Sequence, residues 1–258
     1  MTWRRSSRSG SDGGVSLTAA QSCSEQMHRG ERLRMALVRD RAAWLEGLCA
    51  ACSGEVAHLG CADSPYTAEL LAAGGLLHQR LVQVAAVTGI DVDADGLALL
   101  ERALPGERFV LADITAGVPA GERGRYGLVI AGEVIEHVPD VESFLHGCAA
   151  LLAPGGRLCV TVPNACCPKI GLRALAGRES VHPDHRVYYG PRTLTRTLAG
   201  AGFELESLAS CFAPVAGSVG RLLVNPLLSL DHRVFRGPVG DGLIAVASAR
   251  SNASTIAS

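Results

Sequence analysis

Hydrophobic residues from position 56 onward fall into two alternating patterns. Short apolar runs such as 56–59 and 128–131 lack the apolar–polar alternation of a half-exposed strand, as expected of strands covered on both faces. Segments between such runs, for example 94–103 and 141–152, carry apolar residues at helical spacing. This alternation of strands and helices predicts a parallel sheet with helices on both faces.

The predicted elements continue almost to the end of the chain. We expect strands at 56–59, 84–90, 109–111, 128–131, 158–162, 203–208 and 243–249, and helices at 66–73, 94–103, 141–152 and 191–201. The last helix has Pro191 in its first turn and Gly202 just past its end, which is the usual asymmetry of helix termini. The chain is therefore expected to be an α/β protein whose main domain covers residues 55–250.

The remaining segments show weaker patterns. Residues 26–54 place leucines and a tryptophan at roughly helical spacing, so we expect a helical N-terminal extension. Residues 1–25 are rich in Ser, Gly and Arg without periodicity and are expected to be a disordered tail, and 251–258 a flexible C-terminus. Segments 165–190 and 212–241 are predicted to cover the substrate side of the domain.

Composition narrows the range of partners. The formal net charge is -1 and aromatics make up 4% of residues, so a broad nucleic-acid-binding surface is not indicated. The sequence shows neither a signal peptide pattern nor an uninterrupted apolar segment of roughly 20 residues, so we expect a cytoplasmic protein without a membrane partner. The 9 cysteines are expected to be reduced. Cys49 and Cys52 form a C-x-x-C without the further ligands of a zinc site, and we interpret them as small buried hydrophobes.

Charged residues and a histidine gather just after the apolar run at 128–131. Glu133, Glu136 and His137 follow it at spacings that place all three on one face of a helical turn. Ligand sites of open parallel sheets lie at the carboxyl ends of their strands, so these side chains are candidates for chemistry. A second polar stretch, HPDHRVYY at 182–189, precedes the last predicted helix.

Three other strand ends carry residues suited to binding a ligand. Gly60 follows the first strand, where a glycine lets the backbone approach a ligand closely. Asp91 ends the second strand, where a carboxylate can accept both hydroxyls of a ribose. Its alternative role is to cap the following helix, which Asp93 can do instead. Asp113 stands at the end of the third strand and offers a further carboxylate at the same edge of the sheet.

These strand ends, taken with the string GEVIEHV and the later PGG, resemble class I S-adenosylmethionine-dependent methyltransferases, especially the subgroup of ubiquinone-pathway O-methyltransferases. The resemblance implies the Rossmann-like methyltransferase fold: a doubly wound, mostly parallel seven-stranded sheet with an antiparallel last strand. It implies S-adenosylmethionine as the cofactor, bound by His58, Gly60, Cys61, Ala62, Asp91, Val92, Asp113, Ile114 and Glu133. His58, Ala62 and Ser64 depart from the family pattern, which has an acidic residue and two glycines there. The change at His58 is the most serious, because the family's acid helps to hold the methionine end of the cofactor.

The polar cluster after 128–131 supports three interpretations of the chemistry. In the first, His137 or His185 is the general base that takes a proton from a hydroxyl acceptor, with Glu133 beside the methionine end of the cofactor. In the second, Glu133, Glu136, His137 and His185 bind a divalent metal, Mg or Mn, as the resemblance to metal-assisted ubiquinone-pathway and small-RNA 2′-O-methyltransferases implies. In the third, Glu133 caps a turn, Glu136 is solvated and His137 only packs near the cofactor.

The sequence thus predicts an S-adenosylmethionine-dependent O-methyltransferase acting on a small-molecule hydroxyl, such as a sugar, a phenol or a secondary metabolite, as a monomer or homodimer. A metal-assisted RNA 2′-O-methyltransferase is the alternative enzyme. The departures at His58, Ala62 and Ser64 leave a third hypothesis, a non-catalytic cofactor-binding partner protein. A nicotinamide-dependent oxidoreductase is disfavoured because the first turn is not G-x-G-x-x-G. His78 and His146 are expected to be core or surface histidines.

Overall fold

The computed structural model describes residues 35–179, 182–212 and 237–250. The expected tail at 1–25, the C-terminus at 251–258 and most of the predicted cover at 212–241 lie outside these residues.

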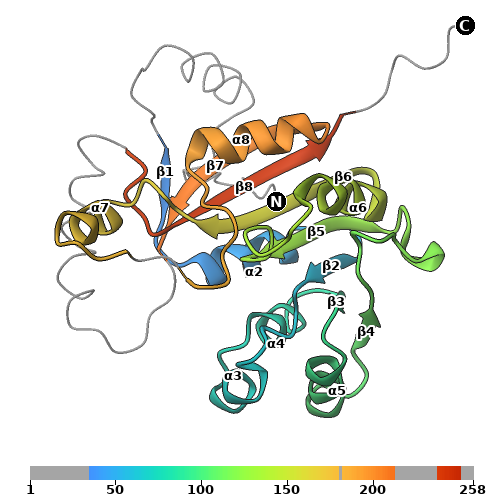
Figure 1. Ribbon diagram of the computed structural model, residues 1–258. Helices are drawn as coiled ribbons and strands as arrows, with labels where there is room; N and C mark the ends of the chain where they lie inside the picture. Colours follow the sequence, from blue (N-terminus) through green and yellow to red (C-terminus); the bar gives the residue numbers. More distant parts are fainter. Residues whose placement is uncertain (1–34, 180–181, 213–236, 251–258) are drawn as a thin grey trace, which may run out of the picture.

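Most of the described strands are separated along the chain by one or two helices (Figure 1). In chain order they are β1 (Ala36–Val38), α2 (Arg41–Ala50), β2 (Val56–Leu59), α3 (Thr67–Ala73), α4 (Leu77–Leu81), β3 (Val87–Asp91), α5 (Ala94–Ala103), β4 (Arg108–Leu111), a 3-10 turn (Ala120–Glu122), β5 (Tyr126–Gly132), α6 (Val141–Leu151), β6 (Leu152–Pro163), α7 (Pro168–Leu175), α8 (Pro191–Gly200), β7 (Phe203–Cys211) and β8 (Gly242–Ala249).

These strands form one eight-stranded sheet in the order β1-β7-β8-β6-β5-β2-β3-β4. β8 runs antiparallel to both of its neighbours, and every other pairing is parallel. The predicted doubly wound, mostly parallel fold with an antiparallel last strand is confirmed, with one strand more than the expected seven. The strand order changes direction between β2 and β5, and such a switch point is where open α/β sheets bind ligands.

The described residues form three hydrophobic clusters, and β2 contributes to two of them, because successive strand residues point to opposite faces of the sheet. Ala57 and Leu59 of β2 belong to the core that includes residues of α6 and α8. Val56 belongs to the opposite core with Leu45 of α2 and Leu81 of α4. All four positions of β2 are buried, which explains why its sequence reads as an apolar run without alternation.

The N-terminal extension contains a strand where the sequence indicated helices. β1 pairs in parallel with the end of β7, which adds the eighth strand at an edge of the sheet. The helix α2 then begins after Asp40, whose side chain accepts a hydrogen bond from the amide of Ala43 at 3.0 Å. A strand of three residues is too short to interrupt the apolar spacing that suggested a helix, so periodicity could not separate the two.

Two short helices have no counterpart among the predicted elements. α4 has five residues, fewer than the span in which helical periodicity can be recognised. α7 lies inside the predicted cover at 165–190, and none of its side chains is buried. Neither these nor any other helix of the described residues is both long and apolar enough to cross a bilayer.

Candidate active site

A cavity of about 1140 Å³ opens at the carboxyl ends of the central strands. Gly60 after β2, Asp91 at the end of β3 and Glu133 after β5 all line it. His137 and His185 line the same cavity. The fold therefore brings together the strand-end residues and the histidines that the sequence singled out, at the switch point where a ligand is expected.

The turn after β2 approaches the cavity closely. Gly60 has a φ of +69°, and a Cβ at this position would lie 2.6 Å from Cγ2 of Val134. Cys61 and Ala62 are both buried, but Cys61 alone of the two lines the cavity. The methyl group of Ala62 faces α5 instead, where a Cβ on Gly96 would come within 2.7 Å of it. A glycine on the neighbouring helix therefore accommodates this alanine without filling the cavity.

Asp91 is fixed in place by two backbone amides. The amide of Ala62 donates to Oδ2 of Asp91 at 2.9 Å, and the amide of Asp93 donates to Oδ1 at 3.0 Å. A carboxylate has about four acceptor sites, so both oxygens can accept a further hydrogen bond. Asp93 caps α5 by accepting from the amide of Asp95 at 3.1 Å, so the helix does not need Asp91 as its cap. Asp91 is thus oriented and available for a ligand.

The residues after β3 and β4 contribute one apolar and one charged surface to the cavity. Val92 is 68% exposed, whereas Ile114 is buried. The amide and hydroxyl of Thr115 donate to Oδ1 of Asp113 at 2.9 and 2.6 Å, and these bonds lower the pKa of Asp113. An apolar wall next to an ionised carboxylate suits a flat ligand with a polar edge.

His58 and His78 form a buried pair in the wall of the cavity. Their Nδ1 atoms lie 3.2 Å apart, and the rings are stacked with an interplanar angle of 8°. Burial lowers the pKa of His58 well below its usual value, and the nearby His78 lowers it further. Burial also lowers the pKa of His78, to about 4. Both imidazoles are therefore neutral near pH 7, and His78 is a core histidine that also lines the cavity.

Glu133 is held by a residue that the sequence did not point to. A guanidinium nitrogen of Arg41 lies 2.5 Å from Oε1 of Glu133, and the hydroxyl of Thr161 donates to the same oxygen at 3.2 Å. Glu133 has a φ of +56°, which is uncommon for a residue with a side chain. Burial raises the pKa of Glu133, and Arg41 opposes this shift. Arg41 lies outside the strand-end motifs, and it reaches the cavity because α2 packs against the sheet.

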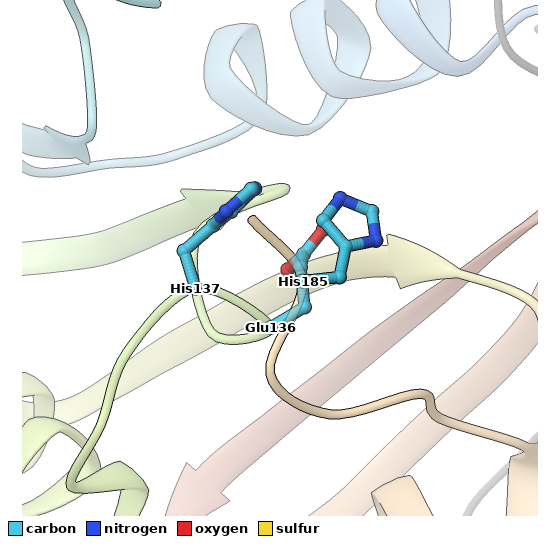
Figure 2. A group of neighbouring side chains, drawn as sticks. All are labelled: Glu136, His137 and His185. Atoms are coloured by element: carbon cyan, nitrogen blue, oxygen red, sulfur yellow. The ribbon is translucent and has the colours of Figure 1, made fainter. Parts of the chain in front are cut away.

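Glu136, His137 and His185 converge on one another (Figure 2). One potential ligand atom of each lies within 4.8 Å of the other two. Glu136 is fully buried, and within the described part of the chain neither of its carboxylate oxygens nor Nδ1 of His185 has a hydrogen-bond partner. Burial, followed by the charge of Glu133, raises the pKa of Glu136 to about 8. Buried groups of this kind are normally paired, and two imidazoles with a carboxylate suit a divalent cation.

This cluster, Glu136 with His137 and His185, joins two separate segments of the chain. The turn after β5 is closed by a hydrogen bond from the amide of His137 to the carbonyl of Val134 at 3.0 Å. The loop before α8 carries His185 and is tied to that turn by the amide of Arg186, which donates to the carbonyl of Glu136 at 2.8 Å. The His137 and His185 rings meet edge to face with centroids 4.6 Å apart. Burial lowers the pKa of His185, and the neighbouring histidines add to this effect.

The structure thus brings together three of the four residues expected to bind a metal and places the fourth, Glu133, in the ion pair with Arg41. A further histidine, His182, lies next to the cluster, with its ring centroid 5.2 Å from that of His185. It lines the cavity as well. The sequence marked His182 only as part of the polar stretch before the last helix.

Comparison with known sequences gives a consistent result. The family model described as "Methyltransferase domain" matches residues 42–208. The ubiquinone biosynthesis O-methyltransferase of Cupriavidus pinatubonensis is 28% identical over 65% of this chain and 67% of that protein. The protein of the same name from Azoarcus sp. is 30% identical over 66% of this chain and 72% of its own length. The protein of this name from Albidiferax ferrireducens is 30% identical over 55% of this chain and 53% of its own length.

Solved structures share the fold at low sequence identity. The small RNA methyltransferase HEN1 superposes with a TM-score of 0.54 at 16% identity, over 82% of this chain and 25% of that chain. A methyltransferase structure from Bacillus halodurans gives a TM-score of 0.52 at 15% identity, over 80% of this chain and 97% of that chain. Both likenesses support the predicted Rossmann-like methyltransferase fold.

Proposed function

Because the chain belongs to the methyltransferase-domain family, we propose that it transfers the methyl group of S-adenosylmethionine to a hydroxyl group of a small molecule. One observation carries this proposal: a single cavity is lined both by the strand-end carboxylates Asp91 and Asp113 and by His137 and His185, which converge with the buried Glu136. The O-methyltransferase name of the relatives supports oxygen as the acceptor atom.

The strand ends fit the adenosine half of this cofactor. Gly60 leaves room for a ligand where a side chain would collide with the opposite loop. The free acceptor sites of Asp91 suit the two ribose hydroxyls, and the ionised Asp113 suits the adenine amino group. Val92 and Ile114 provide the apolar surfaces between which a flat base can lie.

Arg41 suits the carboxylate at the methionine end. A guanidinium group has five N–H donors, so Arg41 can keep its bond to Glu133 and still donate to a second carboxylate. In this arrangement Glu133 orients the arginine and also offsets part of its charge. Cys61 also lines the cavity, directly after Gly60 in the sequence.

The cluster Glu136, His137 and His185 suits the acceptor. The cofactor, when bound, supplies an electrophilic methyl group, so the protein has to align a nucleophilic oxygen and provide for its proton. We assign the cluster to a divalent cation such as Mg or Mn, because two carboxylate oxygens and an imidazole nitrogen lack partners there among the described residues. A cation at this position would lower the pKa of a hydroxyl bound to it. Without one, His137 or His185 would be the proton acceptor.

An RNA 2′-hydroxyl is the alternative acceptor, and it uses the same cluster. The net charge of -1 argues against it, since RNA binding depends on basic groups that neutralise phosphates. A non-catalytic cofactor-binding role would leave the unpaired groups of the cluster without a purpose. Cytoplasmic location and a monomeric or dimeric state stay predictions.

The test is methyl transfer from S-adenosylmethionine with an isotopically labelled methyl group to a panel of phenols, sugars and short RNAs, with EDTA and with added Mn. We expect labelled product from a small hydroxyl compound in the presence of Mn, and none after Glu136→Gln. Label on RNA alone would favour the alternative acceptor, and full activity in EDTA would assign the proton transfer to a histidine without metal. Labelled product from none of the acceptors would contradict the proposed reaction.

A further inference from the structure

We propose that His58 and His78 act as a pair that presents one fixed N–H donor to the carboxylate at the methionine end of the cofactor. The proposal rests on the proposed function, because it names a contact within that cofactor site. His58 is the donor and His78 is a positioning residue that fixes its proton.

The contact between the rings requires a particular distribution of protons. Two Nδ1 atoms 3.2 Å apart can form a hydrogen bond only if one carries a proton and the other does not. The planes of the two rings differ by only 8°, with the ring centroids 5.4 Å apart. His58 and His78 are 3% and 0% exposed, so water does not compete for it.

The surroundings of His78 decide which ring donates. Nε2 of His78 is buried and has no hydrogen-bond partner within the described residues. A buried N–H without a partner is rarer in proteins than an acceptor without one, so Nε2 of His78 is the bare nitrogen. His78 then carries its proton on Nδ1 and donates to Nδ1 of His58. His58 must consequently carry its own proton on Nε2.

The free side of His58 belongs to the cavity wall. His58 lines the cavity, and its only hydrogen bond among the described residues is the one to His78. In the sheet it pairs with Ile130 of β5, the strand that leads directly to Glu133 and thus to the Arg41 ion pair. His58 therefore lies in the same wall as the guanidinium assigned to the cofactor carboxylate. A neutral N–H beside a guanidinium can contribute to binding the same anion without adding charge repulsion.

Binding measurements with two ligands test this contact. S-adenosylhomocysteine carries the amino-acid carboxylate, whereas 5′-methylthioadenosine lacks the whole amino-acid end and probes only the adenosine half. We expect His58→Asp to weaken S-adenosylhomocysteine binding about tenfold or more, because it replaces a donor by a like charge. His58→Gln keeps an N–H donor and should stay within about threefold of wild type. Both variants should bind 5′-methylthioadenosine as wild type does, which also shows that they are folded.

Two binding results would overturn the inference. If His58→Asp binds S-adenosylhomocysteine as tightly as wild type or more tightly, the site still requires an acceptor and the inference fails while the proposed function stands. If wild type binds neither ligand, the proposed function fails and the inference with it.

Nitrogen NMR of the wild-type protein with labelled histidines independently reports which ring nitrogen of His58 and of His78 carries the proton. A pair with a merely structural role would not require one particular arrangement of these protons. We expect a protonated Nε2 and a bare Nδ1 for His58, and the reverse for His78, with assignments taken from His58→Gln and His78→Leu. In His78→Leu the His58 proton is free to occupy either nitrogen, and S-adenosylhomocysteine should bind about three- to tenfold more weakly. A proton on Nδ1 of His58 in the wild-type protein would overturn the assignment.

Discussion

Replacing Glu136 by glutamine should stabilise the metal-free protein at alkaline pH. The folded pKa of Glu136 is raised from 4.5 to about 8, so the folded state holds a proton that the unfolded state loses earlier. Stability is therefore fully present below pH 4.5 and is lost as the pH rises to 8. At about 1.4 kcal/mol per pH unit this interval corresponds to at most ~5 kcal/mol. The charge of Glu133 contributes part of this pKa shift, so we expect less than the full amount. Glu136→Gln should raise the free energy of unfolding by about 2–4 kcal/mol over wild type at pH 8.

The assay is urea denaturation in EDTA at pH 5 and pH 8, with Glu101→Gln on the exposed side of α5 as the matched control. The control should match wild type at both pH values, whereas the advantage of Glu136→Gln should shrink at pH 5. Added Mn should stabilise wild type at pH 8 and leave Glu136→Gln unchanged, since binding to the folded state raises stability by mass action. If Glu136→Gln is less stable than wild type at pH 8 in EDTA, the carboxylate has a stabilising partner and the reasoning is refuted.

Three further predictions concern the cofactor site and the fold. Asp91→Asn should raise the Kd for S-adenosylhomocysteine about tenfold in a calorimetric titration, while Asp93→Asn, which keeps a helix cap, should not; equal losses would indicate general loop damage. Glu122 is buried and bonded to Arg108, and its pKa is lowered to about 2, so it stabilises the fold above pH 4.5 and less toward pH 2. The arginine is 41% exposed, so Glu122→Gln should cost about 1–2 kcal/mol at pH 7, and a cost that does not shrink at pH 3 would count against this origin. Gly60→Ala should unfold at lower urea than Gly74→Ala, because both have positive φ but a methyl at Gly74 meets no atom within 4 Å; equal midpoints would contradict the close approach at Gly60.

The local patterns predicted the sheet because strands covered on both faces leave a strong trace in the sequence. The helix at 94–103 has the predicted bounds, and its cap residue Asp93 was recognisable from the strand end before it. The strand β1 left no such trace, since three residues at an edge of the sheet bury too little to set a pattern. Its place depends on pairing with Ala209–Cys211, far away in the chain, which periodicity cannot report.

The candidate site shows the same division between local and distant information. Asp91 ends β3 and Glu136 lies in the turn after β5, so the topology rule for parallel sheets was enough to suggest them. Arg41 and His78 lie on α2 and α4, and they reach the cavity only because these helices pack on the sheet. No short motif contains either residue. The contact between His58 and His78 spans 20 positions, and a single sequence gives no means of pairing them.

The measurement that tests the account most directly is a calorimetric titration of S-adenosylhomocysteine into the purified protein, with EDTA and again with Mn. We predict binding in the micromolar range under both conditions, since the adenosine half of the site does not involve the cation cluster. We also predict that Asp91→Asn weakens it in both. The absence of binding by wild-type protein in either buffer would contradict the assignment of this cavity as the S-adenosylmethionine site.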